Sequence, residues 1–128
     1  MTAPNPNTPP AQVYAAAYTT YWQAGWQGIL PLPPGRKKHP PEGWTGNHGA
    51  TPSYPDLHAW AEERPNANIA LRLPETIIGI DIDAYPGKDG ANTLTALENT
   101  WGPLPPTWRS TSRDDGTSGI RLYRAPAG

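Results

Sequence analysis

The chain has 128 residues and a formal net charge of −1, with 18 Pro, 13 Gly, six Trp and six Tyr but no Cys. This length is enough for one ordinary domain or a part of one. The lack of cysteine excludes a disulfide framework and a thiolate zinc site, and the three scattered His argue against a His-based metal site, so we expect any metal site to use oxygen ligands. No apolar run approaches the roughly 18 residues that span a bilayer, and the first residues lack the features of a secretory signal. We therefore expect a cytoplasmic protein with no membrane partner.

Aromatic residues must supply much of the core. Leu, Ile and Val account for only 17 residues, but each Trp or Tyr buries far more area than a Val. A net charge near zero argues against disorder, so we expect a folded domain. The same small charge means that any contacts with a polyanion must be concentrated in one patch.

The elements are predicted from hydrophobic periodicity and from Pro and Gly positions. Residues 1–10, with four Pro, predict a disordered leader before a domain at 11–128. The predicted elements in chain order are a helix at 11–24, a short strand at 26–32, a long Pro- and Gly-rich loop, a helix at 54–64, strands at 68–73 and 76–83, a helix at 91–102, and a hairpin of 107–113 with 118–124.

This order of elements predicts an α+β fold, in which a mixed β-sheet has helices covering at least one face. The strand at 76–83 is nearly all apolar and β-branched, so we expect it to be a central strand. The first helix has an aromatic stripe, which includes Tyr14 and Tyr18, and this stripe is expected to pack in the core.

Two aspartates end the most hydrophobic predicted strand. Because side chains alternate along a strand, Asp81 and Asp83 are expected on one face, about 7 Å apart, with Ile80 and Ile82 packed on the other face. Two anions held beside a buried strand repel each other unless cations neutralise them. Divalent ions such as Mg²⁺ prefer oxygen ligands, so the pair is a candidate metal site. The alternative is a pair of solvated residues that terminate the strand.

Three consecutive cations, Arg36, Lys37 and Lys38, lie in the Pro-rich loop after the first predicted strand. Flanking prolines limit the conformational cost of holding them, which suits a triphosphate or a nucleic-acid backbone. The alternative is a solvated charge run with no ligand.

The predicted hairpin contains four arginines: Arg109, Arg113, Arg121 and Arg124. Ile120 and Leu122 favour the core face of their strand, so Arg121 is expected to face the same side as the aspartates if the hairpin belongs to the same sheet. Two exposed aromatic candidates for stacking on a base are Trp44 and Trp108, although core packing is the favoured role for either.

Taken in order, these motifs resemble the N-terminal domain of the bifunctional DNA primase/polymerases (prim-pol), a branch of the archaeo-eukaryotic primase superfamily found in phages, plasmids and bacteria. The resemblance covers roughly residues 11 to 126. It implies an N-terminal αβ module followed by the start of an RRM-like sheet. The matching segments are Tyr21 to Trp26, Ile29 to Leu32, Gly35 to Pro40, Gly43 with Trp44, Asn68 to Leu71, Ile78 to Asp83, Leu104 to Thr107 and Ser118 to Tyr123.

The resemblance implies roles for individual residues. Asp81 and Asp83 match the first catalytic motif of the family, which holds Mg²⁺ or Mn²⁺. The cations Arg36, Lys37 and Lys38 match the loop that lies near the nucleotide phosphates in similar domains.

The segment from Ser118 to Tyr123 matches the second motif, which implies nucleotide binding by Ser118 and Arg121 and a catalytic role for Arg121. The family commonly has His at the position of Arg121, and an arginine still binds phosphate but does not titrate. A third motif, an acidic residue on a later strand, is expected beyond Gly128, so we expect a truncated domain.

The implied activity is template-directed, metal-dependent nucleotidyl transfer from NTP or dNTP in DNA replication, with single-stranded DNA as the template. A helicase domain in the parent protein is left open as a further partner. The alternative is a catalytically inactive or truncated module that binds nucleotide or nucleic acid. A nucleotide-sugar transferase also uses two aspartates at this spacing, but it ranks last because it predicts a much longer chain.

Overall fold

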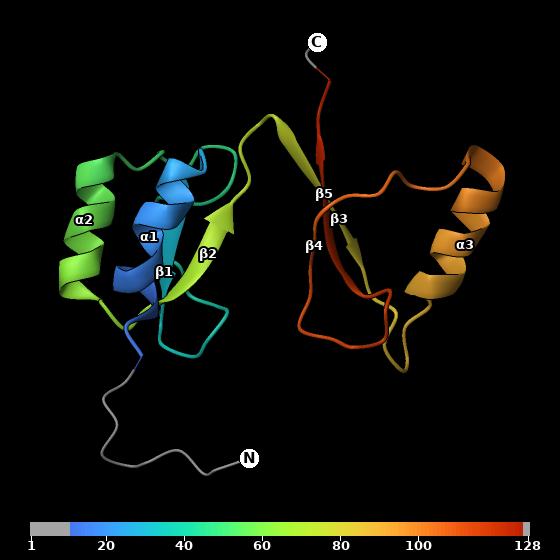
Figure 1. The fold of residues 1–128 in the computed structure, drawn as a ribbon, viewed down its shortest axis with the longest axis horizontal. Helices are drawn as coiled ribbons and strands as arrows, with labels where there is room; N and C mark the ends of the chain where they lie inside the picture. Colours follow the sequence, from blue (N-terminus) through green and yellow to red (C-terminus); the bar gives the residue numbers. More distant parts are fainter. Residues whose placement is uncertain (1–10, 127–128) are drawn as a thin grey trace. The chain divides into compact units, whose positions relative to one another are not determined.

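The computed structural model describes residues 11–126, and the chain divides into two compact units whose boundary falls between Pro74 and Glu75. The leader expected at 1–10 lies outside the described residues. Three helices and two small antiparallel sheets confirm the α+β class (Figure 1). The strands form one sheet in each unit, where the sequence suggested a single mixed sheet. No helix within residues 11–126 is long and apolar enough to cross a membrane.

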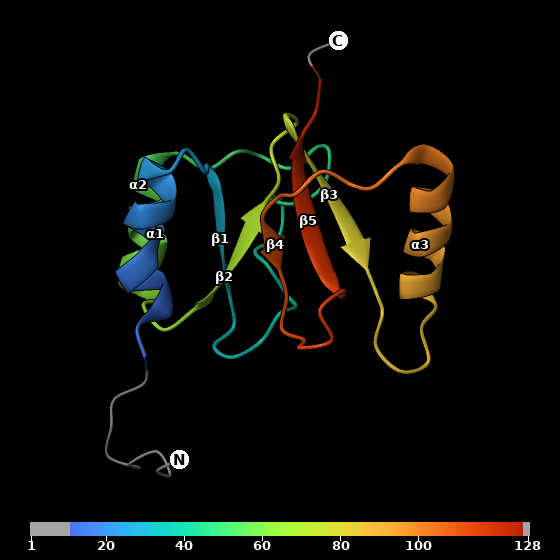
Figure 2. The same ribbon diagram turned by 45° about the vertical axis from the view of Figure 1, so that its right-hand side comes forward.

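The first unit places two helices against a two-stranded sheet. Strands β1 and β2 pair antiparallel, with Gly28 opposite Arg72 and Leu32 opposite Asn68. Both helices contact β1 and lie on the same side of this sheet (Figure 2). The elements are α1 (Val13–Gln23), β1 (Gly28–Leu32), α2 (Tyr54–Glu63) and β2 (Asn68–Arg72), all within a few residues of the predicted positions.

The core of the first unit is aromatic, as its composition predicts. Tyr14 and Tyr18 are buried, and their rings stack with centroids 5.8 Å apart. They pack with Ile29 of β1 and with Leu57 and Trp60 of α2. The Tyr14 hydroxyl donates a 2.7 Å hydrogen bond to the carbonyl of Ile29, so the helix is tied to the strand by one buried polar contact.

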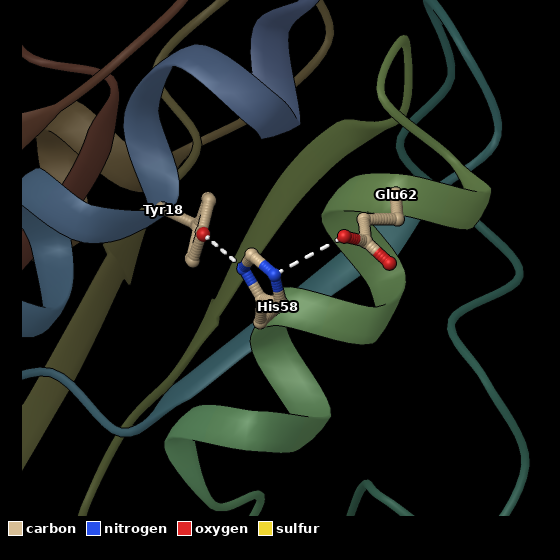
Figure 3. A network of polar contacts seen from close by, with 3 residues as sticks. All are labelled: Tyr18, His58 and Glu62. Atoms are coloured by element: carbon tan, nitrogen blue, oxygen red, sulfur yellow. Dashed lines mark hydrogen bonds and ion pairs between the residues drawn. The ribbon is translucent and has the colours of Figure 1, made fainter.

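A polar chain joins the two helices at the edge of this core. The Tyr18 hydroxyl lies 2.9 Å from Nδ1 of His58, and Nε2 of His58 lies 3.2 Å from Glu62 (Figure 3). Because a carboxylate only accepts, Nε2 carries the proton and Nδ1 accepts from the phenol when the imidazole is neutral. The N-terminus of α2 is fixed by a capping box, in which Ser53 and Asp56 satisfy each other's backbone N–H groups.

The second unit is a three-stranded antiparallel sheet with one helix. Its elements are β3 (Ile77–Ile82), α3 (Gly90–Trp101), β4 (Arg109–Ser110) and β5 (Gly119–Arg124). The predicted hairpin is confirmed, because β4 and β5 pair antiparallel. Figure 1 shows α3 running beside the sheet, and its contacts are with β3.

The expectation that residues 76–83 form a central strand is wrong. The strand order is β3-β5-β4, so β5 is central, and among the described residues β3 pairs on one side only. Its isoleucines indicate a strong strand propensity, but propensity does not fix the position of a strand in a sheet. Ile78 and Ile80 remain partly exposed, and only Ile82 is buried, at 6% exposure.

Helix α3 buries none of its residues within the described chain. Leu97 and Trp101, which share one helical face, are exposed, Trp101 at 83%. The second unit therefore owes its order to backbone pairing and to side-chain hydrogen bonds in its turns more than to a large apolar core.

We expect Tyr14→Phe to destabilise the first unit by about 1–2 kcal/mol, because the Ile29 carbonyl loses its buried donor while the ring packing is kept. Urea unfolding of the full chain measures the change. Tyr21→Phe, at a half-buried ring on the same helix, is the matched control. Equal effects of the two substitutions would show that the buried hydrogen bond adds nothing.

Candidate active site

The two aspartates lie at the end of β3. Asp81 is in the strand, Asp83 follows its last residue, and both side chains are exposed while Ile82 between them is buried. This alternation is what an extended segment with both carboxylates on one side produces. The end of β3 therefore has an acidic surface, and it is formed by Asp81 and Asp83, the two residues selected from the sequence.

Backbone contacts hold this strand end in place. The N–H of Gly90, the first residue of α3, donates a 2.9 Å hydrogen bond to the carbonyl of Asp83. A β-carbon at position 90 would lie 2.1 Å from that carbonyl oxygen, so the approach requires glycine. The next residue, Ala84, is also held, because its N–H donates a 2.9 Å hydrogen bond to the Ser118 hydroxyl.

Ser118 is 3% exposed and connects this strand end to the hairpin turn. Its hydroxyl donates to the Asp115 carboxylate at 2.5 Å, and the N–H groups of Ser118 and Thr117 donate to the same side chain. These bonds, first that from the hydroxyl, together with the charge of Arg109 lower the pKa of Asp115 to about 2. The hydroxyl of Ser118 is thus engaged within the unit, and its expected nucleotide contact stays a prediction.

The register of β3 and β5 decides which side chains share a face. Residues directly opposite in an antiparallel pair point to the same side of the sheet. Asp81 is opposite Ile120, which is opposite Ser110, so these three form one row across the sheet. Ile80 is opposite Arg121, and Arg121 is opposite Arg109. Because neighbouring rows alternate, the two arginines lie on the face opposite to Asp81.

The expectation that Arg121 faces the same side as the aspartates is therefore wrong. It rested on placing Ile120 in the core, but Ile120 is 41% exposed and lies beside Asp81. Alternation within one strand gives the parity of its own side chains, whereas the register between β3 and β5, which are separated in the chain by α3 and β4, is not fixed by a single turn. A shift of one residue would have exchanged the two faces.

The residues at this strand end suit a divalent cation of the magnesium type. Mg²⁺ keeps several waters and is commonly held by one or two carboxylates together with substrate phosphates. Asp81 and Asp83 supply that number of exposed oxygen ligands. Within residues 11–126, no group of three or more His, Asp or Glu side chains gathers in a way that could hold a metal ion.

The basic loop belongs to the first unit and follows β1. Arg36, Lys37 and Lys38 are all exposed. A turn closed by a 3.0 Å hydrogen bond from the Arg36 N–H to the Pro33 carbonyl begins the loop, and the Asn68 side chain donates to the Arg36 carbonyl at 2.9 Å. The backbone of Arg36 is thus anchored, and the charged ends remain in solvent.

Arg72 is a structural residue that sequence reasoning missed. Its guanidinium donates to three backbone carbonyls of the loop after β1, those of Trp44, Gly46 and Ala50, at 3.2, 2.9 and 2.8 Å. The Trp44 ring packs edge-on against Trp60 at 5.1 Å, in the packing role favoured from the sequence. No local pattern marks Arg72, because its partners lie more than twenty residues away in the chain.

Trp108, in contrast, is 86% exposed, so the packing role favoured for it from the sequence is not seen. It precedes β4, and its carbonyl accepts a hydrogen bond from the Leu122 N–H at 3.1 Å. The backbone of Trp108 is therefore fixed to the central strand while its indole faces solvent.

The chain is thus an α+β protein with exposed paired aspartates at a strand end and an exposed basic loop. Comparison with protein-family models identifies the family: residues 18–128 match "Bifunctional DNA primase/polymerase, N-terminal". The chain belongs to this Prim-Pol family. No curated protein and no solved structure matched the chain.

The turn at Asp115 gives a pH-dependent prediction. Its pKa is lower in the folded chain, about 2, than the ordinary 3.8, so its stabilising contribution is present above 3.8 and is lost as the pH falls toward 2. The free energy of unfolding of the parent chain should exceed that of Asp115→Asn at about pH 6, and the difference should shrink as the pH falls from 3.8 through about 2. Asp114→Asn, in the same turn, is the control, and a difference that is constant with pH would contradict the assignment.

Gly90→Ala should displace the end of β3, because its new methyl group would overlap the Asp83 backbone. We expect a loss of roughly 1–3 kcal/mol in the free energy of unfolding, the usual range for overpacking. Urea unfolding measures this loss, with the exposed helical substitution Asn92→Ala as the control. A Gly90→Ala variant as stable as the parent chain would show that the strand end is not held by this contact.

Proposed function

We propose that this chain carries the metal-binding part of a DNA primase/polymerase domain, which transfers nucleotides from NTP or dNTP to a growing strand under the direction of a single-stranded DNA template. Membership in the Prim-Pol family supports the reaction class. The observation that carries the site is the exposed pair Asp81 and Asp83 around buried Ile82.

In this proposal the aspartates bind and orient a divalent cation. Their carboxylate oxygens are the ligands that Mg²⁺ and Mn²⁺ prefer. Such an ion, when bound, favours deprotonation of a 3′-hydroxyl and neutralises triphosphate charge. The contact between Gly90 and Asp83 and the bond from Ala84 to Ser118 keep the strand end in one conformation, which lowers the entropic cost of binding.

The cations have separate roles. Arg36, Lys37 and Lys38 offer phosphate groups an exposed, backbone-anchored loop in the first unit. Arg121, on the face opposite to Asp81, is suited to a phosphate that is not bound to the metal. Ser118 acts as a positioning residue through the turn that it holds.

A second candidate is a module that binds nucleotide or nucleic acid without catalysis. It is favoured by the observation that only two carboxylates gather at the site in the described part of the chain. Two-metal nucleotidyl transfer places a pair of ions on the attacking and leaving oxygens, and a pair of ions commonly has more ligands than two carboxylates.

Asp81→Asn tests the proposed site. The substitution removes one anionic ligand with little change in size, so Mn²⁺ binding should weaken and primer extension should fall by about 100-fold or more. Extension of a primed single-stranded template with dNTP and Mn²⁺ measures activity, and calorimetric titration with Mn²⁺ measures binding. Asp114→Asn, an exposed carboxylate in the hairpin turn, should retain both properties.

The two candidates differ in the behaviour of the parent chain. Extension by the parent chain that is lost in Asp81→Asn supports the polymerase. Mn²⁺ binding without any extension supports the non-catalytic module. Extension retained in Asp81→Asn would remove these aspartates from the proposed mechanism.

A further inference from the structure

Two arginines face each other on the sheet of the second unit. Arg109 of β4 is directly opposite Arg121 of β5, so their side chains leave the same face from neighbouring positions. Like charges directly opposite in a sheet are destabilising in the absence of a counter-charge. In the described part of the chain, neither guanidinium forms an ion pair with a carboxylate. The two guanidinium groups therefore offer N–H donors on the same face of the sheet.

These arginines line a pocket of about 250 Å³, together with the segment Leu104 to Thr107. Three hydrogen bonds fix that segment. The Tyr123 hydroxyl donates to the Pro105 carbonyl at 2.9 Å, the Thr107 hydroxyl donates to the Leu122 carbonyl, and the Leu104 N–H donates to Glu98 at 2.9 Å. Two prolines further restrict the wall, so the pocket exists before any ligand binds.

The nearby carboxylates leave the two arginines available. Asp115 is close enough to Arg109 for the guanidinium to lower its pKa, but its oxygens accept from the hydroxyl and N–H of Ser118 and from Thr117. Glu98 uses an oxygen to hold Leu104. A guanidinium pair in a preformed pocket matches the geometry of a phosphate group, which accepts several N–H donors at once.

We propose that Arg109 and Arg121 form a phosphate-binding site for the backbone of a single DNA strand, on the face of the sheet opposite to Asp81. The register separates this site from the aspartates, so it is unsuited to a triphosphate bound to their metal. The choice of a strand as the partner rests on the proposed function, because a template-directed enzyme must hold a strand in addition to the incoming nucleotide. The exposed indole of Trp108 directly precedes Arg109 and is available to stack on a base of that strand.

Binding of a fluorescent single-stranded oligonucleotide to the full chain, measured by anisotropy in EDTA, tests the site. Arg109→Gln and Arg121→Gln should each weaken binding by about tenfold, the usual loss for one charged hydrogen bond. Each should also reduce the slope of log affinity against log salt by about 0.7, the value for one phosphate contact on a single strand. Arg124→Gln removes the same charge from the other face of β5 and is the matched control, expected to bind within about twofold of the parent.

The outcomes separate this site from the metal site. Asp81→Asn should bind the oligonucleotide like the parent in EDTA, so a failure of the proposed catalysis leaves this test intact. Equal losses in Arg124→Gln and Arg121→Gln would overturn the proposal, because general charge would then explain the binding. Tripolyphosphate serves as a second probe. If Arg109→Gln and Arg121→Gln lost the binding of tripolyphosphate but bound the oligonucleotide like the parent, the proposal would also be overturned, in favour of a free phosphate ligand.

Thermal unfolding tests whether the two arginines have a purely structural role. Without DNA, Arg121→Gln should unfold at the same temperature as the parent or a higher one, because it removes the repulsion from Arg109. Weaker DNA binding together with unchanged or raised stability supports the proposal. Weaker binding that accompanies a lower unfolding temperature in both variants would overturn it.

Discussion

The register between β3 and β5 is the constraint on which the chemistry of the second unit depends. By pairing Asp81 with Ile120 and Ile80 with Arg121, it assigns Asp81 and the opposed pair Arg109 and Arg121 to opposite faces of one thin sheet. In a strand pair, a slip of one residue transfers every side chain to the other face. The register therefore determines which ligands each face can bind, before any individual side chain is considered.

The second unit has little apolar burial, so its strand register depends on polar contacts. Ile82 is its only buried apolar residue in the described chain, so hydrophobic burial alone gives a weak preference between registers. The Ser118 hydroxyl links Ala84, at the end of β3, to Asp115, in the turn before β5. At the other end of β5, the Ala125 N–H donates to the Thr76 carbonyl at 2.8 Å. Both ends of the pair are thus fixed by contacts that a slipped register would lose.

The sequence was sufficient for the features that depend on local patterns. Helical spacing found α1 with Tyr14 and Tyr18 in its core face, and the apolar strand pattern led to the aspartates at the end of β3. It was insufficient where an outcome depends on pairing between distant segments. The edge position of β3 and the face of Arg121 both follow from which strand lies beside which, and in what register. Nothing in the local sequence of either strand specifies that.

The two faces of the sheet share one energetic property. Each concentrates like charges, with Asp81 and Asp83 near one strand end and Arg109 opposite Arg121 on the other face. Repulsion between the opposed arginines opposes the folded register, repulsion between the two aspartates opposes the extended strand end, and a ligand of opposite charge relieves either one. A ligand that binds only the folded state stabilises that state by mass action. A cation on one face and a phosphate on the other would therefore both stabilise the same folded state, although they share no contact. Each ligand would then favour the binding of the other in a chain where the register is only partly populated, because the two bind the same folded state.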